Sequence, residues 1–223
     1  MNLINREYIE KYLSSLVSYP ETPVMKEMRS IAANNGYPII RPEVAALLNV
    51  IIRIKQPQSI LEIGTSIGYS GLLMLQSMGS EGHLTTVEIQ DELIKTARAN
   101  FETQKVLNQV TLIQGDGEEV LHFLENKFDI IFLDGPKAQY LLYLPDCLRL
   151  LKEDGLLICD DVLFYGMVAK KELLQKRKIT IVKRMRKFLR IISDHPLLDT
   201  TILPIGDGMS ISVKRRMTYE KIT

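Results

Sequence analysis

The chain has 223 residues, 46% of them hydrophobic, which suits one α/β domain with a substantial core, or such a domain with a short helical extension. Its formal net charge is +1. Its two cysteines, Cys147 and Cys159, lack CxxC or Cys/His spacing, which argues against a disulfide framework or a zinc site. No apolar run approaches the roughly 20 residues that span a bilayer, and the N-terminus lacks a secretory-signal pattern. We therefore expect a cytoplasmic protein without a membrane partner.

Residues 1–40 differ from the rest of the chain. Apolar side chains recur there at helical spacing until Pro20 and Pro23 interrupt the pattern. The recurring residues are Tyr8, Ile9, Tyr12, Leu13 and Leu16. We expect residues 1–40 to form a helical extension that acts as a lid or a dimer contact, and residues 41–216 to form the main domain. Helical spacing resumes at VMKEMRSIAANNG and again from Pro42.

Strand and helix patterns alternate in the main domain. Strand patterns occur at 59–63, 83–88, 110–114, 129–133 and 156–159, with helical segments between them. Such alternation predicts a parallel sheet that helices cover on both faces. The runs DTTILPI and MSISVKR, joined by a Gly-Asp-Gly turn, predict a final antiparallel hairpin. The expected fold is therefore α/β and Rossmann-like, with seven mostly parallel strands.

A glycine turn follows the first predicted strand, in SILEIGTSIGYS. Gly64 and Gly68 allow a tight turn, but Ser66 stands where a dinucleotide fold would place its second glycine. The pattern therefore argues against NAD and favours a nucleoside cofactor without a pyrophosphate. Glu88 closes the next strand pattern, where a carboxylate can accept hydrogen bonds from both hydroxyls of a ribose. An ordinary turn followed by a surface glutamate is the alternative interpretation.

Acidic residues follow two later strand patterns. FDIIFLD ends in Asp134, and GLLICDD ends in Asp160 and Asp161. If the two strands are neighbours, three carboxylates converge, which favours a bound Mg²⁺ because that ion prefers oxygen ligands. Lys137 could face the same pocket as a proton acceptor with a lowered pKa, and Asp116 could bind an adenine amino group. Turn chemistry at the aspartates and a solvated lysine are the alternatives.

A strongly basic segment lies between residues 170 and 190. It contains ten basic residues and one acid, Glu172, so its net charge is +9 and the rest of the chain carries −8. From an N-cap at Thr180, a helix would place apolar side chains on one face and five cations on the other. These cations are Lys183, Arg184, Arg186, Lys187 and Arg190. Such a face favours contact with nucleic-acid phosphates, with a plain solvated face or an acidic membrane surface as alternatives.

The motifs together resemble the metal-dependent, S-adenosylmethionine-using O-methyltransferases, the family of the catechol and caffeoyl-CoA enzymes. The resemblance covers roughly residues 42–214 and rests on LEIGTSIGYS, TVE, GDG, FLDGPKAQY and ICDDVLFYG. It implies a class I methyltransferase fold and a cofactor site made of Ile40, Glu62, Gly64, Ser66, Ser70, Glu88, Asp116, Gly117 and Asp134. It also implies that Asp134, Asp160 and Asp161 bind the metal, and that Lys137 and Asp134 are catalytic. Relatives commonly have Asn in place of Asp161.

Bacterial members of this family with a similar ending, DTTILPIGDGMSISVKR, methylate 5-hydroxyuridine at the wobble position of tRNA. The resemblance therefore implies a tRNA anticodon stem-loop as partner and 5-methoxyuridine as product. The 5-hydroxyl and the O4 carbonyl are adjacent oxygens that can chelate Mg²⁺ as a catechol does. A methyltransferase for small catechol or caffeoyl-CoA-like acceptors, and a noncatalytic RNA-binding module, are the alternatives. Relatives of this kind commonly form homodimers.

Overall fold

In the computed structural model of the protein, residues 6–216 are described. Seven strands form one sheet in the order β3-β2-β1-β4-β5-β7-β6. The strands are β1 (Ser59–Ile63), β2 (His83–Glu88), β3 (Val110–Gln114), β4 (Phe128–Leu133), β5 (Leu151–Cys159), β6 (Leu198–Leu203) and β7 (Met209–Lys214). Strands β1 to β5 pair in parallel, whereas β7 pairs antiparallel with both β5 and β6. The predicted fold class and the final hairpin are thereby confirmed.

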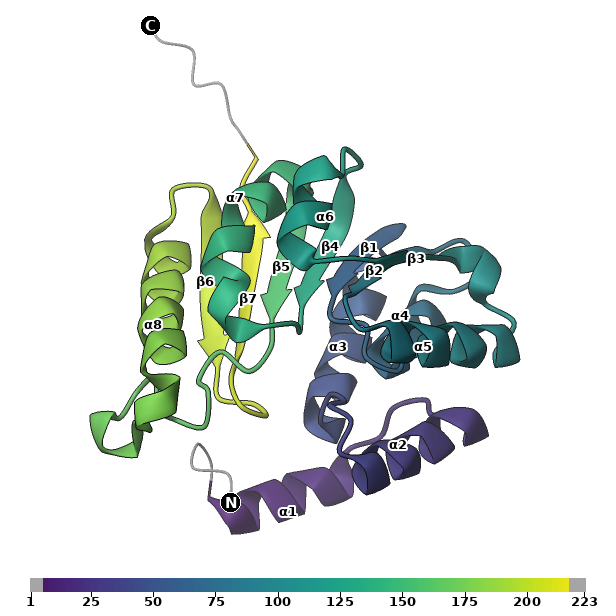
Figure 1. The fold of residues 1–223 in the computed structure, drawn as a ribbon, viewed down its shortest axis with the longest axis horizontal. Coiled ribbons are helices and arrows are strands. Elements are labelled where there is room, and N and C mark those ends of the chain that lie inside the picture. Colours follow the sequence, from purple (N-terminus) through teal and green to yellow (C-terminus); the bar gives the residue numbers. More distant parts are fainter. Residues whose placement is uncertain (1–5, 217–223) are drawn as a thin grey trace, which may run out of the picture.

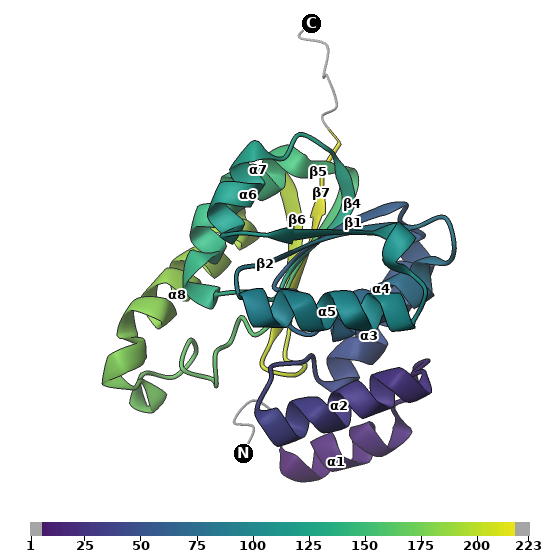
Figure 2. The ribbon, with the colours of Figure 1, turned by 45° about the vertical axis from the view of Figure 1, so that its right-hand side comes forward.

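Helices cover both faces of the sheet (Figures 1 and 2). One face carries α3 (Pro42–Lys55), α4 (Tyr69–Met78) and α5 (Asp91–Thr103), and α2 (Pro23–Asn35) packs against α4. The other carries α6 (Gly117–Phe123), α7 (Tyr140–Leu150) and α8 (Ile179–Asp194). Successive strand residues point to opposite faces, so Ile130 packs in the first core and Ile131 in the second. Both cysteines are buried and free, as expected of thiols without a partner.

Short 3₁₀ turns lie in the connections between these elements. They are η1 (Leu107–Gln109), η2 (Lys137–Gln139), η3 (Lys171–Leu173) and η4 (Lys176–Lys178). The last of these precedes α8, whose N-cap is Lys178, so Thr180 lies inside the helix rather than at the predicted cap. Strand β5 is longer than its apolar core suggested, because the polar stretch before Leu156 also adopts strand geometry.

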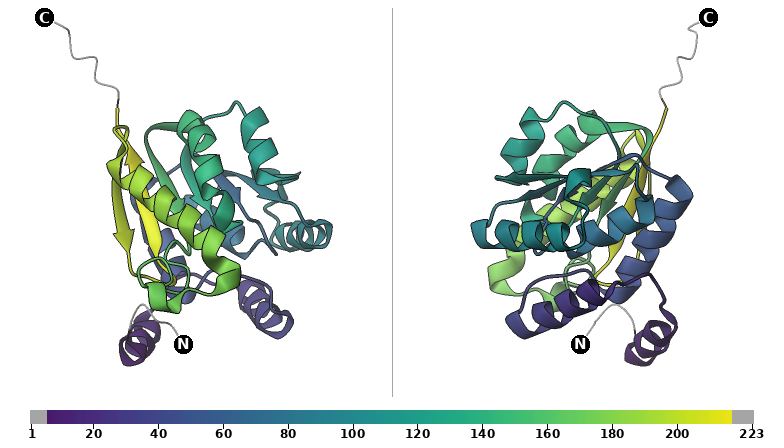
Figure 3. Two further views of the ribbon diagram at one scale, coloured as in Figure 1. Left: turned by 60° about the vertical axis from the view of Figure 1, so that its left-hand side comes forward. Right: turned by 90° about the vertical axis from the view of Figure 1, so that its right-hand side faces the viewer.

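The N-terminal helices lie below the edge of the sheet where β1 to β5 end (Figures 1 and 3). Helix α1 (Glu7–Leu16) exposes Tyr8, Tyr12 and Leu16 by 64%, 64% and 61%, whereas α2 buries Met25 and Met28 in the first core. A helical extension up to residue 40 stays a prediction, and residues 1–5 lie outside the described part of the chain. Helix α2 is fixed to α4 by a hydrogen bond from Arg29 to the hydroxyl of Tyr69.

Candidate functional site

The carboxyl ends of β1, β2, β4 and β5 meet at one edge of the sheet. Strand pairing continues past the strand ends, because Asp134 N donates to Ile63 O at 2.9 Å and Asp160 N donates to Leu133 O at 3.0 Å. The hydroxyl of Tyr140 connects the ends of β4 and β5, because it donates to the carbonyls of Leu133 and Asp160. In open α/β sheets this edge is where ligands bind.

Gly64 begins the turn after β1, and no other residue fits there. Its φ is +105°, and a Cβ atom would lie 2.8 Å from the carbonyl carbon and oxygen of Asp134. Both facts require glycine at this position. The absence of a side chain lets β1 and β4 end side by side with open space above them.

A pocket of about 410 Å³ lies above this turn. Of the residues assigned to cofactor binding, six line it: Gly64, Ser66, Glu88, Asp116, Gly117 and Asp134. Ile40 instead lines a neighbouring cavity of about 180 Å³, which shares Asp134, Lys137 and Asp161 with the pocket. Glu62 and Ser70 lie below the pocket floor, where both side chains are buried.

Backbone amides hold the Glu88 carboxylate in place. Ser66 N donates to Oε2 at 2.9 Å, and Ile89 N and Gln90 N each donate to Oε1 at 3.0 Å. A carboxylate oxygen has more than one acceptor position, so Glu88 can still accept from a ligand hydroxyl. The turn after β1 and the end of β2 are thus tied together at the pocket wall.

Glu62 is a buried acid beneath the same turn. Its Oε1 accepts from Ser70 Oγ, and its Oε2 accepts from Thr86 Oγ1 at 2.6 Å. Burial raises the pKa of Glu62 to about 8, although the hydrogen bonds from Ser70 and Thr86 oppose the shift. Glu62 therefore joins β1, β2 and α4 from below and does not face the pocket.

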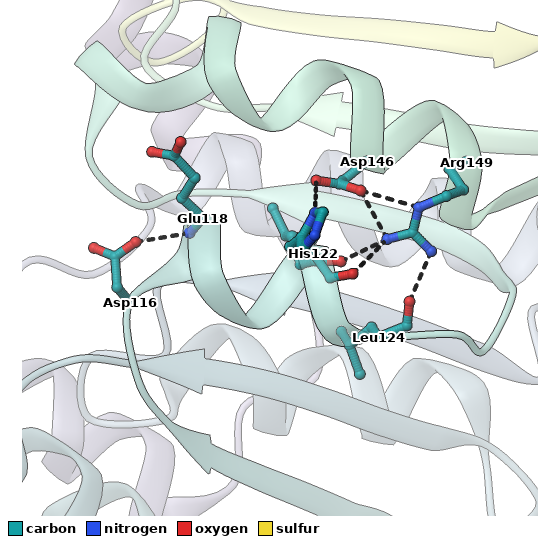
Figure 4. A network of polar contacts seen from close by, with 7 residues as sticks. Asp116, Glu118, His122, Leu124, Asp146 and Arg149 are labelled. Carbon is teal, nitrogen blue, oxygen red and sulfur yellow. Dashed lines mark hydrogen bonds and ion pairs between the residues drawn. The ribbon is translucent and has the colours of Figure 1, made fainter.

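Asp116 and Gly117, at the N-terminal end of α6, line the pocket. Figure 4 shows Asp116 before the first turn of this helix and Arg149 near its other end. Asp116 is the N-cap, and its Oδ1 accepts from Glu118 N at 2.8 Å. At the other end of α6, Arg149 donates to the carbonyls of Leu121, His122 and Leu124 and pairs with Asp146. The hydrogen bond from Glu118 N fixes the orientation of the Asp116 carboxylate.

Three aspartates and one lysine meet between the two cavities. Lys137 Nζ lies 2.8 Å from Asp134 Oδ1 and 3.2 Å from Asp161 Oδ2, and Asp160 accepts from Asp161 N. Burial, with repulsion from Asp134 and Asp161, raises the pKa of Asp160 well above its usual range. Within residues 6–216, no group of three or more His, Cys, Asp or Glu side chains is arranged to hold a metal ion. The lysine ammonium bridges two of the predicted ligands.

The protonation of Lys137 differs from the expectation. Burial alone would lower its pKa, but the carboxylates of Asp134 and Asp161, together with Tyr140, raise it well above the usual value. In this state Lys137 is a charged donor. A lowered pKa would require another cation to neutralise the two aspartates.

Several lining residues were not identified from the sequence. Phe164 and Tyr165 line the larger pocket, and Tyr165, Arg41 and Asp207 line the smaller one. The turn Gly206-Asp207-Gly208 gave a signal for Asp207, since an acid between two glycines also fits a functional loop. Phe164 and Tyr165 belong to the motif ICDDVLFYG, but the sequence analysis assigned them no role in the site.

The cationic face of α8 divides into two groups. Lys183, Lys187 and Arg190 are exposed, and within the described chain they have no hydrogen bond or ion pair. Arg184 donates to the carbonyl of Ala138 at 3.3 Å, and Arg186 donates to those of Val168 and Met167. The apolar face packs into the second core as predicted.

Among the helices of residues 6–216 we find none with the length and apolar character for crossing a bilayer.

Comparison with known proteins gives a consistent result. A family model described as O-methyltransferase matches residues 14–215. A Mycobacterium ulcerans protein named as a putative O-methyltransferase is 28% identical over 199 residues, which are 88% of this chain and 87% of that protein. A Staphylococcus aureus structure, described as a putative caffeoyl-CoA O-methyltransferase, has a TM-score of 0.86 and 32% identity, covering 93% of this chain and 100% of its own. A Bacillus cereus O-methyltransferase in complex with SAH has a TM-score of 0.81 and 25% identity, covering 93% and 97%.

Proposed function

The chain belongs to the O-methyltransferase family, and from this premise we propose a specific methyl-transfer reaction. The family confirms the expected enzyme class. In our proposal the donor is S-adenosylmethionine, and the acceptor is the 5-hydroxyl of 5-hydroxyuridine at the wobble position of tRNA. One observation carries the proposal: the Asp134–Lys137 pair lines both cavities, and Arg184 from the cationic helix contacts Ala138 beside it.

The larger pocket would hold S-adenosylmethionine. Glu88 would accept from the ribose hydroxyls, and Asp116 at the α6 N-terminus would accept from the adenine amino group. Gly64 and Asp134 line the same part of the pocket and would lie beside the sulfonium end. The Bacillus cereus relative in complex with SAH supports this donor.

Magnesium would fit the neighbouring donor set. Three carboxyl groups, those of Asp134, Asp160 and Asp161, surround the single ammonium of Lys137, and the raised pKa of Asp160 reflects the shortage of positive charge in this cluster. The donor atoms are all oxygens, which Mg²⁺ prefers, and these three residues would hold the ion once Lys137 Nζ moves away from Asp134 and Asp161, which it bridges in this structure. Bound there, Mg²⁺ would supply Lewis-acid chemistry that lowers the pKa of the acceptor hydroxyl.

The protein's own residues mainly position the reactants. Lys137 Nζ can donate to the acceptor oxygen and stabilise its negative charge while the methyl group moves. It can accept the hydroxyl proton only when the charges of Asp134 and Asp161 are neutralised, because those carboxylates keep its pKa high. The sulfonium loses its charge during transfer, so alignment is the main requirement.

The acceptor proposal rests on charge. Lys183, Lys187 and Arg190 form an exposed row of cations with few acids near it in sequence, as phosphate-binding surfaces do. An anticodon loop can present a splayed base to a pocket while its phosphates meet these side chains. A small catechol or caffeoyl-CoA-like acceptor is the second candidate, because the Staphylococcus aureus relative carries that description. Membership of an enzyme family disfavours a noncatalytic RNA-binding module.

Assembly and location are also proposals. The exposed apolar face of α1, with Tyr8, Tyr12 and Leu16, suits a contact with a second copy of the chain, and we propose a homodimer. A cytoplasmic location stays a prediction. Size measurement by light scattering on the full chain and on a Tyr12→Lys variant would test the dimer.

The reaction can be tested directly with purified protein and labelled S-adenosylmethionine. An anticodon stem-loop carrying 5-hydroxyuridine should be methylated when Mg²⁺ is present, and the rate at limiting RNA should fall steeply with salt. The same stem-loop with uridine is the matched control and should stay unlabelled. Equal rates on a free dihydroxyphenol, without salt dependence, would instead favour the small-molecule reaction.

A further inference from the structure

The loop after β5 brings three side chains to the two cavities. Asp161, Phe164 and Tyr165 all line the larger pocket, and Asp161 and Tyr165 also line the smaller one. Tyr165 remains 60% exposed. An acceptor that lies between the cavities would contact these side chains. The position of residues 161–170 therefore determines the shape of the acceptor site.

The backbone of this loop does not adopt a low-energy conformation by itself. Asp161, Phe164 and Tyr165 have φ angles of 55°, 45° and 56°, in the left-handed region that residues with a side chain rarely occupy. An aromatic residue gains no local hydrogen bond in exchange, unlike asparagine or aspartate. Contacts with other parts of the protein must hold the loop in this shape.

The hairpin between β6 and β7 provides the first set of contacts. The Asp207 carboxylate accepts from Tyr165 N at 2.7 Å, and its carbonyl accepts from Leu163 N at 2.9 Å. Val162 N donates to Gly208 O at 2.9 Å. These bonds hold the first half of the loop and leave the second half to another partner.

Helix α8 is that partner. Arg186 Nε donates to Val168 O at 2.8 Å, and Arg186 Nη2 donates to Met167 O at 3.0 Å. Phe164 and Met167 also pack against Val182, one turn earlier on the same helix. The guanidinium is thus bonded to two successive carbonyls of the loop, and it is less exposed than Lys183 and Lys187 beside it.

We propose that Arg186 is a positioning residue, which holds the loop over the acceptor site and does not contact RNA phosphates. The inference rests on the proposed methyl transfer but not on the acceptor being RNA. The basic segment then has two roles. Lys183, Lys187 and Arg190 would bind the acceptor, whereas Arg186 would keep Tyr165 and Asp161 in place for any acceptor.

The position of the loop can be measured without activity. The chain contains no tryptophan, so Tyr165→Trp introduces a single tryptophan in the loop, which can be excited at wavelengths that tyrosine does not absorb. In that background, Arg186→Met should shift the emission maximum and increase quenching by acrylamide, and Arg186→Lys should restore part of the difference because one amine can reach one carbonyl. Lys187→Met, the matched control on the same helix, should leave the emission as it is. Circular dichroism checks that each variant folds. If Arg186→Met does not fold, the emission of Arg186→Lys is compared with that of the Tyr165→Trp protein instead.

Kinetics on the chain with Tyr165 intact supply the second measurement. Arg186→Met should lower kcat about tenfold or more, because a displaced wall misaligns the acceptor. The KM for S-adenosylmethionine and the salt dependence of RNA binding should not change. Lys187→Met, in contrast, should weaken RNA binding and reduce its salt dependence.

Two results would overturn the inference. In the first, Arg186→Met reduces the salt dependence of RNA binding as much as Lys187→Met does and leaves the loop fluorescence unchanged. Arg186 would then be a phosphate contact. The other is unchanged fluorescence together with unchanged kcat. If the unmodified chain methylates no acceptor, the proposed function fails, and the fluorescence comparison still decides the role of Arg186.

Discussion

Lys137 Nζ lies 2.8 Å from Asp134 Oδ1, three residues earlier in the chain, where β4 ends between the two cavities. This pair links the donor side of the site to the acceptor side. Asp134→Asn should therefore lower the rate of methyl transfer by about 10²-fold or more, because the acceptor oxygen loses its charged surroundings. Affinity for S-adenosylmethionine, measured by calorimetry, should stay within about threefold.

Asp146 provides a matched control for that change. Its Oδ1 lies 2.7 Å from Arg149 Nη2, also three residues away, but on α7 and outside both cavities. Asp146→Asn should leave methyl transfer nearly unchanged. Equal losses of rate in the two variants would show that the first effect came from a general disturbance of folding.

Gly64→Ala should weaken cofactor binding. The added Cβ would lie 2.8 Å from the Asp134 carbonyl carbon, so β1 and β4 could not end side by side. We expect S-adenosylmethionine affinity to fall about tenfold or more, equivalent to about 1.4 kcal/mol. Gly36→Ala is the control, since Gly36 has a φ of +70° but no atom within 4 Å of an added Cβ. It should cost about 1 kcal/mol of stability and leave cofactor binding intact. Binding by Gly64→Ala at the original affinity would contradict the account.

Stability should fall as pH rises because of Glu62. Burial raises the pKa of its carboxyl from 4.5 to about 8 in the folded chain. Between these values the unfolded chain has lost a proton that the folded chain keeps, so the free energy of unfolding falls by up to about 1.4 kcal/mol per pH unit. This contribution is complete below pH 4.5 and is lost as the pH passes about 8.

Urea unfolding of the ligand-free protein at several pH values between those limits measures the effect. The Glu62→Gln variant can still accept from Ser70 or Thr86 but does not titrate, so the difference in stability from the unmodified protein should vary with pH. Parallel curves for the two proteins would show that Glu62 does not hold its proton.

The exposed cations of α8 should control RNA affinity and little else. The double variant Lys187→Glu, Arg190→Glu should weaken binding of an anticodon stem-loop and reduce the slope of log affinity against log salt by about 0.7 to 0.9 per lost phosphate contact. Arg98→Glu with Lys105→Glu reverses two exposed charges elsewhere and is the control. A filter-binding titration at several salt concentrations gives both values. Identical slopes for the two double variants would exclude α8 as the RNA surface.

The sequence predicted those parts of the protein that short-range patterns determine. The apolar runs identified each strand, the turn at Gly64 identified the ligand-binding edge, and the acids at strand ends identified the cluster around Asp134. These predictions of the site succeed because parallel strands bring their carboxyl ends together whatever the details of packing.

Properties that depend on long-range contacts were not predictable in the same way. The charge state of Lys137 depends on its distance from Asp161, and Glu62 and Ser70 bond to each other below the pocket. The helical periodicity of α8 placed Arg186 among the free cations, but its bonds to Met167 and Val168 depend on how a loop folds back. Periodicity gives the face of a helix and not the partners that cover it.

Mass-spectrometric analysis of the nucleosides in tRNA tests the proposed acceptor most directly. Cells that lack this protein should lose 5-methoxyuridine and accumulate 5-hydroxyuridine, and the unmodified gene should reverse both changes whereas Asp134→Asn should not. An unchanged level of 5-methoxyuridine in those cells, with no accumulated 5-hydroxyuridine, would contradict the account and leave a small hydroxylated molecule as the acceptor.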